Sequence, residues 1–431
     1  MKTVICVVFL VSQQPFVAIL KVESLTQEAL FDRSIRAGFG WVSYRLPSKD
    51  GVLVPEPQHF IDPEANTKRP WEEGSRNGFV IVPFSLVHGP ELWLNPLIRW
   101  QGTVPNTQAL SSASQWMELS VSGDELLKEH PENLTDHIES QFTNEKNLEQ
   151  NDSQHYLEFC RSVRQITEIL QNKVPNSEGV HDSKALQKVV WSWTRSLRLH
   201  PKAHPCHLFE ALCHAYPSLH IVLLHHPVYG IWLGSSPETL VEKETPRIRS
   251  MALAGTRSLA HAGPWGDKEI REQRLVLDYL QERFASKSIS LDLQETSTVQ
   301  KGPVEHLLNK IEGVSSISCY EMAHCLHPTP AVAGFPVAES VKYILENEPH
   351  QRSLYAGYWG YLNEEGNGLL SVNLRCLHWN DKRVTLYMGA GILPESDAET
   401  EWLETCRKSE TLMNILQSLG WISPPAGILG E

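Results

Sequence analysis

The stretch that most constrains the fold is an apolar strand that runs into glycines and then into a helix. Residues 384–392 (VTLYMGAGI) alternate apolar side chains, and Gly389 and Gly391 predict a turn whose backbone amides can approach an anion. Three polar residues then share one helical face at i, i+3 and i+7, and they are Glu401, Glu404 and Lys408. Such a face beside a glycine turn could hold a divalent metal and an organic acid together. The alternative interpretation is an exposed helix with an ordinary Glu–Lys pair.

Composition describes an ordinary globular protein, with 431 residues, 41% of them hydrophobic and 21% charged. The net charge of −13 argues against sequence-independent binding to nucleic acid or to a membrane surface, so we expect no such partner. The eight cysteines include no C-x-x-C pair, which argues against a disulfide framework. This cysteine usage fits a reducing compartment, and we expect a cytoplasmic protein.

The N-terminal residues 4–11 form an apolar run after Lys2, which is also how a secretion signal begins. The run is short and no small-x-small cleavage site follows it, so we favour a buried strand. No segment approaches about 20 consecutive apolar residues, and the sequence therefore predicts no transmembrane span.

The remainder predicts the α/β class in an α+β arrangement, in which strand pairs alternate with helices. Residues 1–150 form a divergent N-terminal part of strands and Pro/Gly turns, followed from 118 to 151 by an acidic helix and linker. Residues 151–425 form the second part. Its clearest predicted elements are helices over 156–170, 204–216 and 267–284, and strands over 185–197 and 221–224.

Two patterns have the residue types of known sites but not their spacing. The first has the ligand types of a zinc site but fits no zinc pattern, and its members are His200, His204, Cys206, His207, Cys213 and His214. The second, Gly389-Ala-Gly391, continues into Ile-Leu-Pro and lacks the third glycine of a dinucleotide fingerprint. We therefore expect neither zinc nor a dinucleotide.

Nine short motifs carry the functional signal. In chain order they are QKVV at 187–190, GSSPE at 234–238, SMALAGT at 250–256, DKEIRE at 267–272, VEHL at 304–307, LHPTPAVAGFP at 326–336, YAG at 355–357, NLR at 373–375 and the strand–glycine–helix stretch. Each is weak alone. Together they closely resemble the chorismate-utilising enzyme family, which comprises the isochorismate, salicylate, anthranilate and aminodeoxychorismate synthases. The resemblance covers about residues 150–420.

This resemblance implies one large fold of stacked antiparallel sheets, surrounded by helices, with a central pocket and Mg²⁺ as cofactor. It implies Glu272 and Glu404 as the metal carboxylates. On the helix from Asp267, Glu272 shares the apolar face with Val276, where an unpaired carboxylate is costly and Mg²⁺ would neutralise it. The alternative for Glu272 is an i,i+4 pair with Lys268.

The resemblance also implies which residues bind chorismate. Arg375 and Lys408, with the backbone of Gly389 and Gly391, would hold the enolpyruvyl carboxylate, because an arginine suits a planar anion. The remaining residues implied at the ring carboxylate or the pocket wall are Gly255, Thr256, His327 and Tyr355.

Few positions distinguish the members of the family. Relatives that add ammonia carry Gln where Lys188 stands, and the aminodeoxychorismate type carries Lys where Ala254 stands. Residues 330–334 resemble the isochorismate branch rather than the Thr-rich salicylate-forming one. We therefore expect conversion of chorismate to isochorismate. Lys188 would be the general base for water attack at C2, and Glu238 the general acid for loss of the C4 hydroxyl.

Other interpretations stay open. By themselves, Lys188 could be a strand-edge charge and Glu238 a turn residue that caps a backbone amide. The protein could be a salicylate synthase, which goes on to release pyruvate, or a catalytically inactive paralogue that acts as a binding subunit. As an isochorismate synthase it would feed menaquinone or siderophore biosynthesis. No amidotransferase motif is present, so we expect no glutamine amidotransferase subunit, and we favour a monomer.

Three departures from the family pattern stand out. Trp193 stands five residues after the lysine, where the family usually has Arg. The segment between Thr256 and Asp267 is short, and Met251 replaces a commonly polar residue. The sequence offers no explanation for Trp193.

Overall fold

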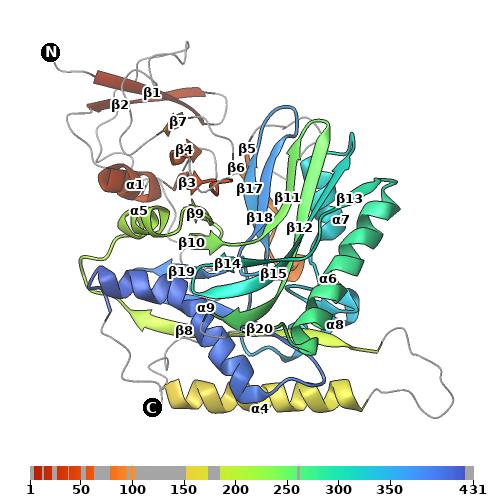
Figure 1. Cartoon of the computed structure of the whole chain (residues 1–431). Helices are drawn as coiled ribbons and strands as arrows, with labels where there is room; N and C mark the ends of the chain where they lie inside the picture. Colours follow the sequence, from red (N-terminus) through yellow and green to blue (C-terminus); the bar gives the residue numbers. More distant parts are fainter. Residues whose placement is uncertain are drawn as a thin grey trace.

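The structure, a computed structural model, describes residues 4–11, 14–21, 27–36, 38–49, 55–62, 78–94, 98–101, 152–172, 185–259 and 263–422. The acidic helix and linker predicted over 118–151 lie outside these residues. Most of the described chain belongs to two antiparallel sheets with helices around them (Figure 1). This confirms the predicted mixed class.

The first sheet has nine strands. In spatial order they are β16 (Gly334–Phe335), β8 (Lys188–Arg198), β20 (Arg383–Ile392), β19 (Cys376–Asn380), β10 (Gly230–Ser236), β9 (His220–His226), β3 (Gly40–Arg45), β4 (Gln58–Asp62) and β7 (Ile98–Gln101). Strands from both ends of the sequence therefore share one sheet, and the N-terminal strands β3, β4 and β7 complete its far edge.

The second sheet lies against the first. Its strands are β13 (Leu291–Leu293), β15 (Val304–Val314), β12 (Arg247–Ser258), β11 (Thr239–Glu244), β18 (Gly368–Val372), β17 (Tyr358–Leu362), β5 (Gly78–Val82) and β6 (Leu92–Leu94), with β14 (Ser297–Lys301) paired to β15. A separate hairpin joins β1 (Val4–Val11) to β2 (Gln14–Lys21). The strand predicted over 4–11 is thus present, whereas the burial of its side chains lies outside what the structure describes.

Helices cover the sheets at several places (Figure 1). They are α1 (Gln27–Arg36), α4 (Asp152–Gln171), α5 (Pro205–Ala215), α6 (Asp267–Ser286), α7 (Cys319–Leu326), α8 (Val337–Asn347) and α9 (Ala398–Ser418). The helix α6 packs on β12 and β15, while α9 packs on β20 and against α4. None of the described helices is both long enough and apolar enough to cross a bilayer.

The sequence explains the two helices that flank the centre. Acidic Asp267 and Glu269 stand in the first turn of α6, where the helix dipole favours negative charge. In α9, Asp397 caps the N-terminus by accepting a hydrogen bond of 2.9 Å from the amide of Thr400. Both helices bury one face, which includes Val276 and Phe284 in α6 and Trp402 and Leu412 in α9.

The chain crosses from one sheet to the other several times, and two of these crossings are adjacent. In these two it passes from β10 to β11 through Glu238, and from β18 to β19 through residues 373–375. The crossings are tied together, because the amide of Val372 donates to the carbonyl of Glu238 at 3.2 Å and the amide of Ser235 donates to the carbonyl of Arg375 at 3.2 Å. Glu238 and Arg375 are therefore fixed where the two sheets meet.

The structure corrects one local prediction. Gly389 and Gly391 do not form a turn but lie within β20, opposite Ser192 and Val190 of β8. The glycines are needed for close approach instead. A Cβ at Gly389 would stand 2.7 Å from the hydroxyl of Tyr355. Strand β19 begins at Cys376, opposite Tyr387, so among the described strands β20 pairs from Met388 to Ile392 with β8 alone.

Candidate active site

A cavity that opens to solvent lies where these two crossings meet β20, α6 and α9. Its lining includes nine of the twelve sequence-predicted site residues, namely Glu238, Gly255, Thr256, Glu272, Tyr355, Arg375, Gly389, Gly391 and Lys408. Two others contact this lining: Lys188 contacts Glu272 and Glu404 contacts Lys408. The fold thus brings together eleven residues that the sequence spreads over more than two hundred positions.

Lys188 is fully buried at the start of β8, and its Nζ lies 2.8 Å from Oε1 of Glu272. Gly391 makes this contact possible, because a Cβ there would stand 2.2 Å from Glu272 Oε1 and 2.8 Å from Lys188 Cε. Burial acts to raise the pKa of Glu272, but the charges of Lys188 and Lys268 outweigh it and hold the pKa below its usual value. The i,i+4 pair of Glu272 with Lys268 is not the observed arrangement, since Lys268 contacts Glu401.

The helix α9 contributes two buried carboxylates and a lysine. Glu404 lies 2.7 Å from Lys408, whose Nζ also donates to the carbonyl of Gly389 at 3.2 Å. Glu401 is fully buried, with Lys268 against its Oε1, while its Oε2 has no hydrogen-bond partner among the described residues. Burial and the neighbouring charge of Glu404 raise the pKa of Glu401 to about 7. The expected Glu–Lys pair therefore exists, but it is largely buried, with Glu404 11% and Lys408 23% exposed.

These carboxylates fit a magnesium ion. The charges of Glu401, Glu404 and Glu272 all act to raise the pKa of Lys268, and Glu401 contacts its ammonium directly. The described residues contain no group of three His, Cys, Asp or Glu side chains arranged to ligate a metal. Mg²⁺ does not need such a group, since it usually takes one or two protein carboxylates and keeps several waters. The orphaned Oε2 of Glu401 is an acceptor that a hydrated cation would satisfy.

Glu238 is the most perturbed acid of the cavity. Burial raises its pKa to about 8, although the charges of Lys188 and Lys408 act in the opposite direction. Its backbone is well held, with its amide donating to Ser236 Oγ at 3.2 Å. Its carboxyl caps no backbone amide among the described residues. A carboxyl that is protonated near neutral pH can serve as a proton donor.

Arg375 is held in a strained conformation at the second crossing, with φ of +46°. This left-handed region costs a non-glycine residue about 1 kcal/mol, so the surrounding contacts must fix it. Its guanidinium donates to the carbonyl of Lys301 at 2.7 Å and lies 3.2 Å from Nε2 of His306. Gly302 leaves room, because a Cβ there would be 2.7 Å from NH1 of Arg375. Burial lowers the pKa of Arg375 to about 10.

His306 lines the cavity and is not among the site residues predicted from the sequence. Since an arginine only donates, Nε2 of His306 accepts and its Nδ1 carries the proton, which is shared with the carbonyl of Gly255 at 3.2 Å. Burial and the nearby charge of Arg375 hold the pKa of His306 well below its usual value. The available signal was its position in the VEHL motif, on a strand that pairs His306 with Thr256.

His327 is the predicted site residue that the fold does not bring to the others. It does not line the cavity, contrary to expectation. It ends α7, its ring packs 5.0 Å from that of Tyr358, and its Nε2 lies 3.3 Å from the carbonyl of Phe84. Burial lowers its pKa to about 4. Tyr355, in contrast, lines the cavity and stacks on Tyr387 at 5.5 Å.

The zinc-like set lies elsewhere, between α1 and α5. Nδ1 of His204 accepts the amide of Cys206 at the start of α5, and its Nε2 lies 3.2 Å from Asp32. His207 pairs with Glu28 on the same helix α1. These histidines join two helices.

The chain belongs to the chorismate-binding enzymes, because the family model described as "Chorismate binding enzyme" matches residues 97–417. It is 34% identical over 199 residues to isochorismate synthase EntC of Escherichia coli (strain K12), covering 43% of this chain and 51% of that protein. It is 34% identical over 203 residues to isochorismate synthase MenF of the same strain, covering 43% and 46%. The chain thus matches about half the length of these curated relatives.

Solved structures show the same fold. The menaquinone-specific isochorismate synthase MenF from Escherichia coli superposes with a TM-score of 0.62 at 20% identity, over 96% of this chain and 94% of that one. A putative 2,3-dihydroxybenzoate-specific isochorismate synthase, DhbC from Bacillus anthracis, gives a TM-score of 0.62 at 19% identity, over 88% and 96%.

Proposed function

We propose that this protein is an isochorismate synthase that uses water, not ammonia, as the nucleophile. The observation that carries the proposal is a buried lysine and a buried glutamic acid at one cavity. Lys188 lies under the cavity in contact with Glu272, and Glu238 lines it with a pKa raised to about 8. Relatives named as isochorismate synthases are among the matches in sequence and in fold, beside an anthranilate synthase component.

In the proposed reaction, Lys188 as the free amine takes a proton from water while the water oxygen bonds to C2 of chorismate. The double bonds of the ring shift, the bond from C4 to its hydroxyl breaks, and Glu238 gives its proton to the departing oxygen. One water is consumed and one is released, so the product is an isomer of the substrate. The two proton transfers leave an ammonium and a carboxylate, which return to their starting states by exchange with solvent.

Substrate recognition is proposed to use the basic side of the cavity. Arg375 and Lys408 would bind the enolpyruvyl carboxylate together with the edge of β20 at Gly389 and Gly391, where β19 no longer covers the strand. His306 fixes the guanidinium of Arg375 for this contact. The ring carboxylate would lie toward Gly255 and Thr256, and Tyr355 would add a hydrogen bond.

Glu272 and Glu404 are proposed to hold Mg²⁺, with Glu401 beside them. Bound Mg²⁺ would supply positive charge for the glutamates and the ring carboxylate, so that Glu272 no longer depends on Lys188 as its counter-ion. The relatives include a menaquinone-specific and a 2,3-dihydroxybenzoate-specific enzyme, and we propose that the product supplies one of these two kinds of pathway. No amidotransferase subunit is needed when water is the nucleophile. The seven cysteines from Cys160 onward are free thiols, which supports the proposed cytoplasmic location.

The test is to incubate the purified chain with chorismate and MgCl₂ and to identify the product by chromatography. We expect isochorismate from the wild type and none from Lys188→Ala, while that variant still binds chorismate by calorimetry. Salicylate with pyruvate would favour the salicylate synthase alternative. No turnover by the wild type would favour an inactive paralogue, and full turnover by Lys188→Ala would overturn the assignment of the base.

A further inference from the structure

Trp193, which stands where the family usually has arginine, lies behind the helix that carries two of the site's glutamates. It is buried in β8, five residues after Lys188, so the two side chains point to opposite faces of the strand. Its indole packs against that of Trp402 in α9, with ring centroids 4.3 Å apart and the ring planes tilted by 31°. Trp193 therefore contacts α9 from outside the cavity.

A chain of hydrogen bonds joins Trp193 to the backbone of α9. The indole N–H donates to Oγ1 of Thr405 at 2.9 Å, and the Thr405 hydroxyl donates to the carbonyl of Trp402 at 2.7 Å. Thr405 is fully buried, so its hydroxyl uses both its donor and an acceptor site inside the protein. Ring packing alone would tolerate small shifts of the indole along α9. The hydrogen bond does not, because the indole N–H has a single acceptor in Thr405.

Thr405 directly follows Glu404, and Trp402 directly follows Glu401. Since each helical residue turns about 100° from the last, the Trp193 contact lies on the strip of α9 next to the two glutamates. Lys408 holds the cavity side of the same helix by donating to the carbonyl of Gly389 at 3.2 Å. The rotation of α9 is thus fixed from two sides.

The chemistry of the indole suits this place. An arginine would add a fixed positive charge beside the helix that carries Glu401 and Glu404. The indole supplies one donor and no charge, so it adds no fixed cation that would compete with a metal ion for these carboxylates. A buried N–H also loses much if its acceptor moves away, which makes it an effective orienting group.

We propose that Trp193 is a positioning residue that sets the rotation of α9 through Thr405 and thereby places Glu404 and Glu401 for Mg²⁺. This inference rests on the proposed function, because it assumes that these glutamates hold the metal. Trp193 itself touches neither substrate nor metal.

The test is calorimetric titration of MgCl₂ into the full-length chain. Trp193→Phe keeps the ring and removes the donor, Thr405→Val removes the acceptor, and Thr405→Ser keeps it. We expect roughly tenfold weaker Mg²⁺ binding in the first two variants and none of this loss in Thr405→Ser. In turnover assays the same two variants should need more Mg²⁺ for half-maximal rate, with kcat at saturating Mg²⁺ close to that of the wild type.

A matched control exists in Trp41, whose indole N–H donates to Ser43 Oγ at 2.8 Å in the buried strand β3. This strand is separated from β8 by β20, β19, β10 and β9. Trp41→Phe should leave Mg²⁺ binding unchanged. Equal Mg²⁺ affinity in Trp193→Phe and wild type, or an equal loss in Trp41→Phe, would overturn the inference alone. A wild type that binds no Mg²⁺ would overturn the metal assignment of the proposed function as well.

Discussion

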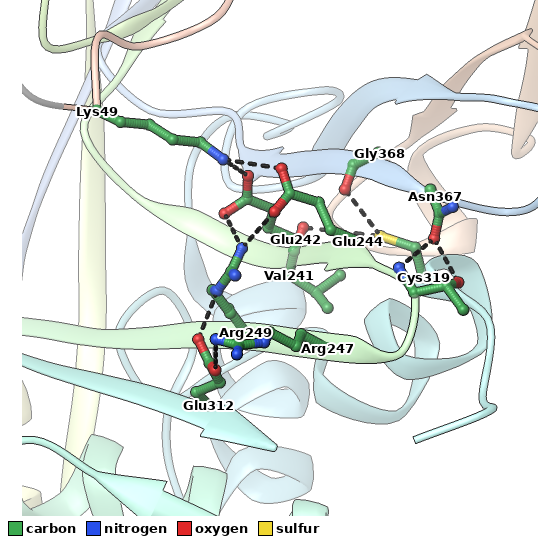
Figure 2. A network of polar contacts seen from close by, with 11 residues as sticks. Lys49, Val241, Glu242, Glu244, Arg247, Arg249, Glu312, Cys319, Asn367 and Gly368 are labelled. Carbon is green, nitrogen blue, oxygen red and sulfur yellow. Dashed lines mark hydrogen bonds and ion pairs between the residues drawn. The ribbon is translucent and has the colours of Figure 1, made fainter. Parts of the chain in front are cut away.

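Two groups of lysine, arginine and glutamate side chains in this molecule have similar composition and opposite surroundings. The surface network ties the segment before β4 to β11, β12 and β15 (Figure 2), and it consists of Lys49, Glu242, Glu244, Arg247, Arg249 and Glu312. The buried cluster consists of Lys188, Lys268, Lys408, Glu272, Glu401 and Glu404. Ion pairs in both are short: Arg249 lies 2.6 Å from Glu312, and Lys188 lies 2.8 Å from Glu272.

The two groups differ in exposure, although their ranges overlap. Side chains of the surface network are exposed from 17% at Glu242 to 60% at Arg247, whereas those of the buried cluster range from 0% at Lys188 to 23% at Lys408. Water screens the first group, so each of its pairs adds little to stability. Moving charges out of water is costly, so the ion pairs of the buried cluster are not expected to add much stability. Buried ionisable groups beside a cavity are instead typical of functional sites. Ion-pair geometry alone does not reveal which group is a site.

The largest expected effect is on kcat and comes from Glu238, a buried acid with a raised pKa that the surface network does not contain. Glu238→Gln removes the proton donor and should lower kcat by roughly a thousandfold, within the range for general acid catalysis. Burial raises the pKa of Glu238 from 4.5 in the unfolded chain to about 8 in the folded one. As pH rises between these values the group ionises only in the unfolded chain, which favours unfolding, so Glu238 lowers the stability of the wild type in this range. The amide cannot ionise, and the variant should therefore be more stable than wild type at pH 7, by about 1–3 kcal/mol.

Steady-state kinetics and urea unfolding measure both effects. In the wild type, the rate should also fall above pH about 8, because Glu238 must be protonated to donate. A Glu238→Gln enzyme with wild-type kcat would remove the assignment of the acid.

The next effect tests the cost of breaking a buried pair. Lys268→Met leaves Glu401 without its counter-ion and should lower the free energy of unfolding by about 3 kcal/mol. The double variant Lys268→Met/Glu401→Leu should regain most of this loss, because no buried charge is then unpaired. Urea unfolding at pH 7 gives both values. If the double variant is as unstable as the single one, burial of the charge is not the cause.

A smaller effect per residue concerns four buried histidines of the first sheet. Burial lowers the pKa of His220 and His226 to about 3 and that of His225 and His378 to about 4. Since an unfolded histidine titrates near pH 6.5, the unfolded chain binds more protons below that pH, and stability falls as pH falls toward the folded values. Each histidine should cost roughly 1.4 kcal/mol at pH 5.5. Unfolding free energies that stay constant from pH 7 to 5.5 would contradict this.

The smallest effect is expected in the surface network. Arg249→Met should change the free energy of unfolding by less than about 1 kcal/mol and leave turnover unchanged, because Arg249 is partly exposed and does not line the cavity. Added salt should reduce the effect further. A loss as large as that of Lys268→Met would mean that exposure does not separate the two groups.

Much of the site could be predicted because the motifs carry it in order. Glu272 was expected on the apolar face of a helix, and Lys408 one turn after Glu404, and both line or contact the cavity. The partners could not be predicted. Spacing suggested Lys268 for Glu272, whereas the fold brings Lys188 from a distant strand to Glu272 and turns Lys268 to Glu401.

The fold class followed from the alternation of strand pairs and helices, but the conformation of the glycines did not. Gly389 and Gly391 indicated a turn, since glycine is common in turns. They lie in β20 because Tyr355, Lys188 and Glu272 approach that strand closely, a demand that local sequence does not show. His327 was misplaced for a related reason, because its motif matched while its side chain faces Phe84 and Tyr358.

The central claim is that a buried lysine and a buried glutamic acid add solvent water to chorismate at one face and remove a hydroxyl at another. Turnover in H₂¹⁸O tests it most directly, with the product analysed by mass spectrometry and NMR. We predict one ¹⁸O per isochorismate, located at C2, and none in product from Glu238→Gln beyond its residual rate. Isochorismate that carries no ¹⁸O would contradict the account, since the C4 hydroxyl would then have moved to C2 without any attack by water.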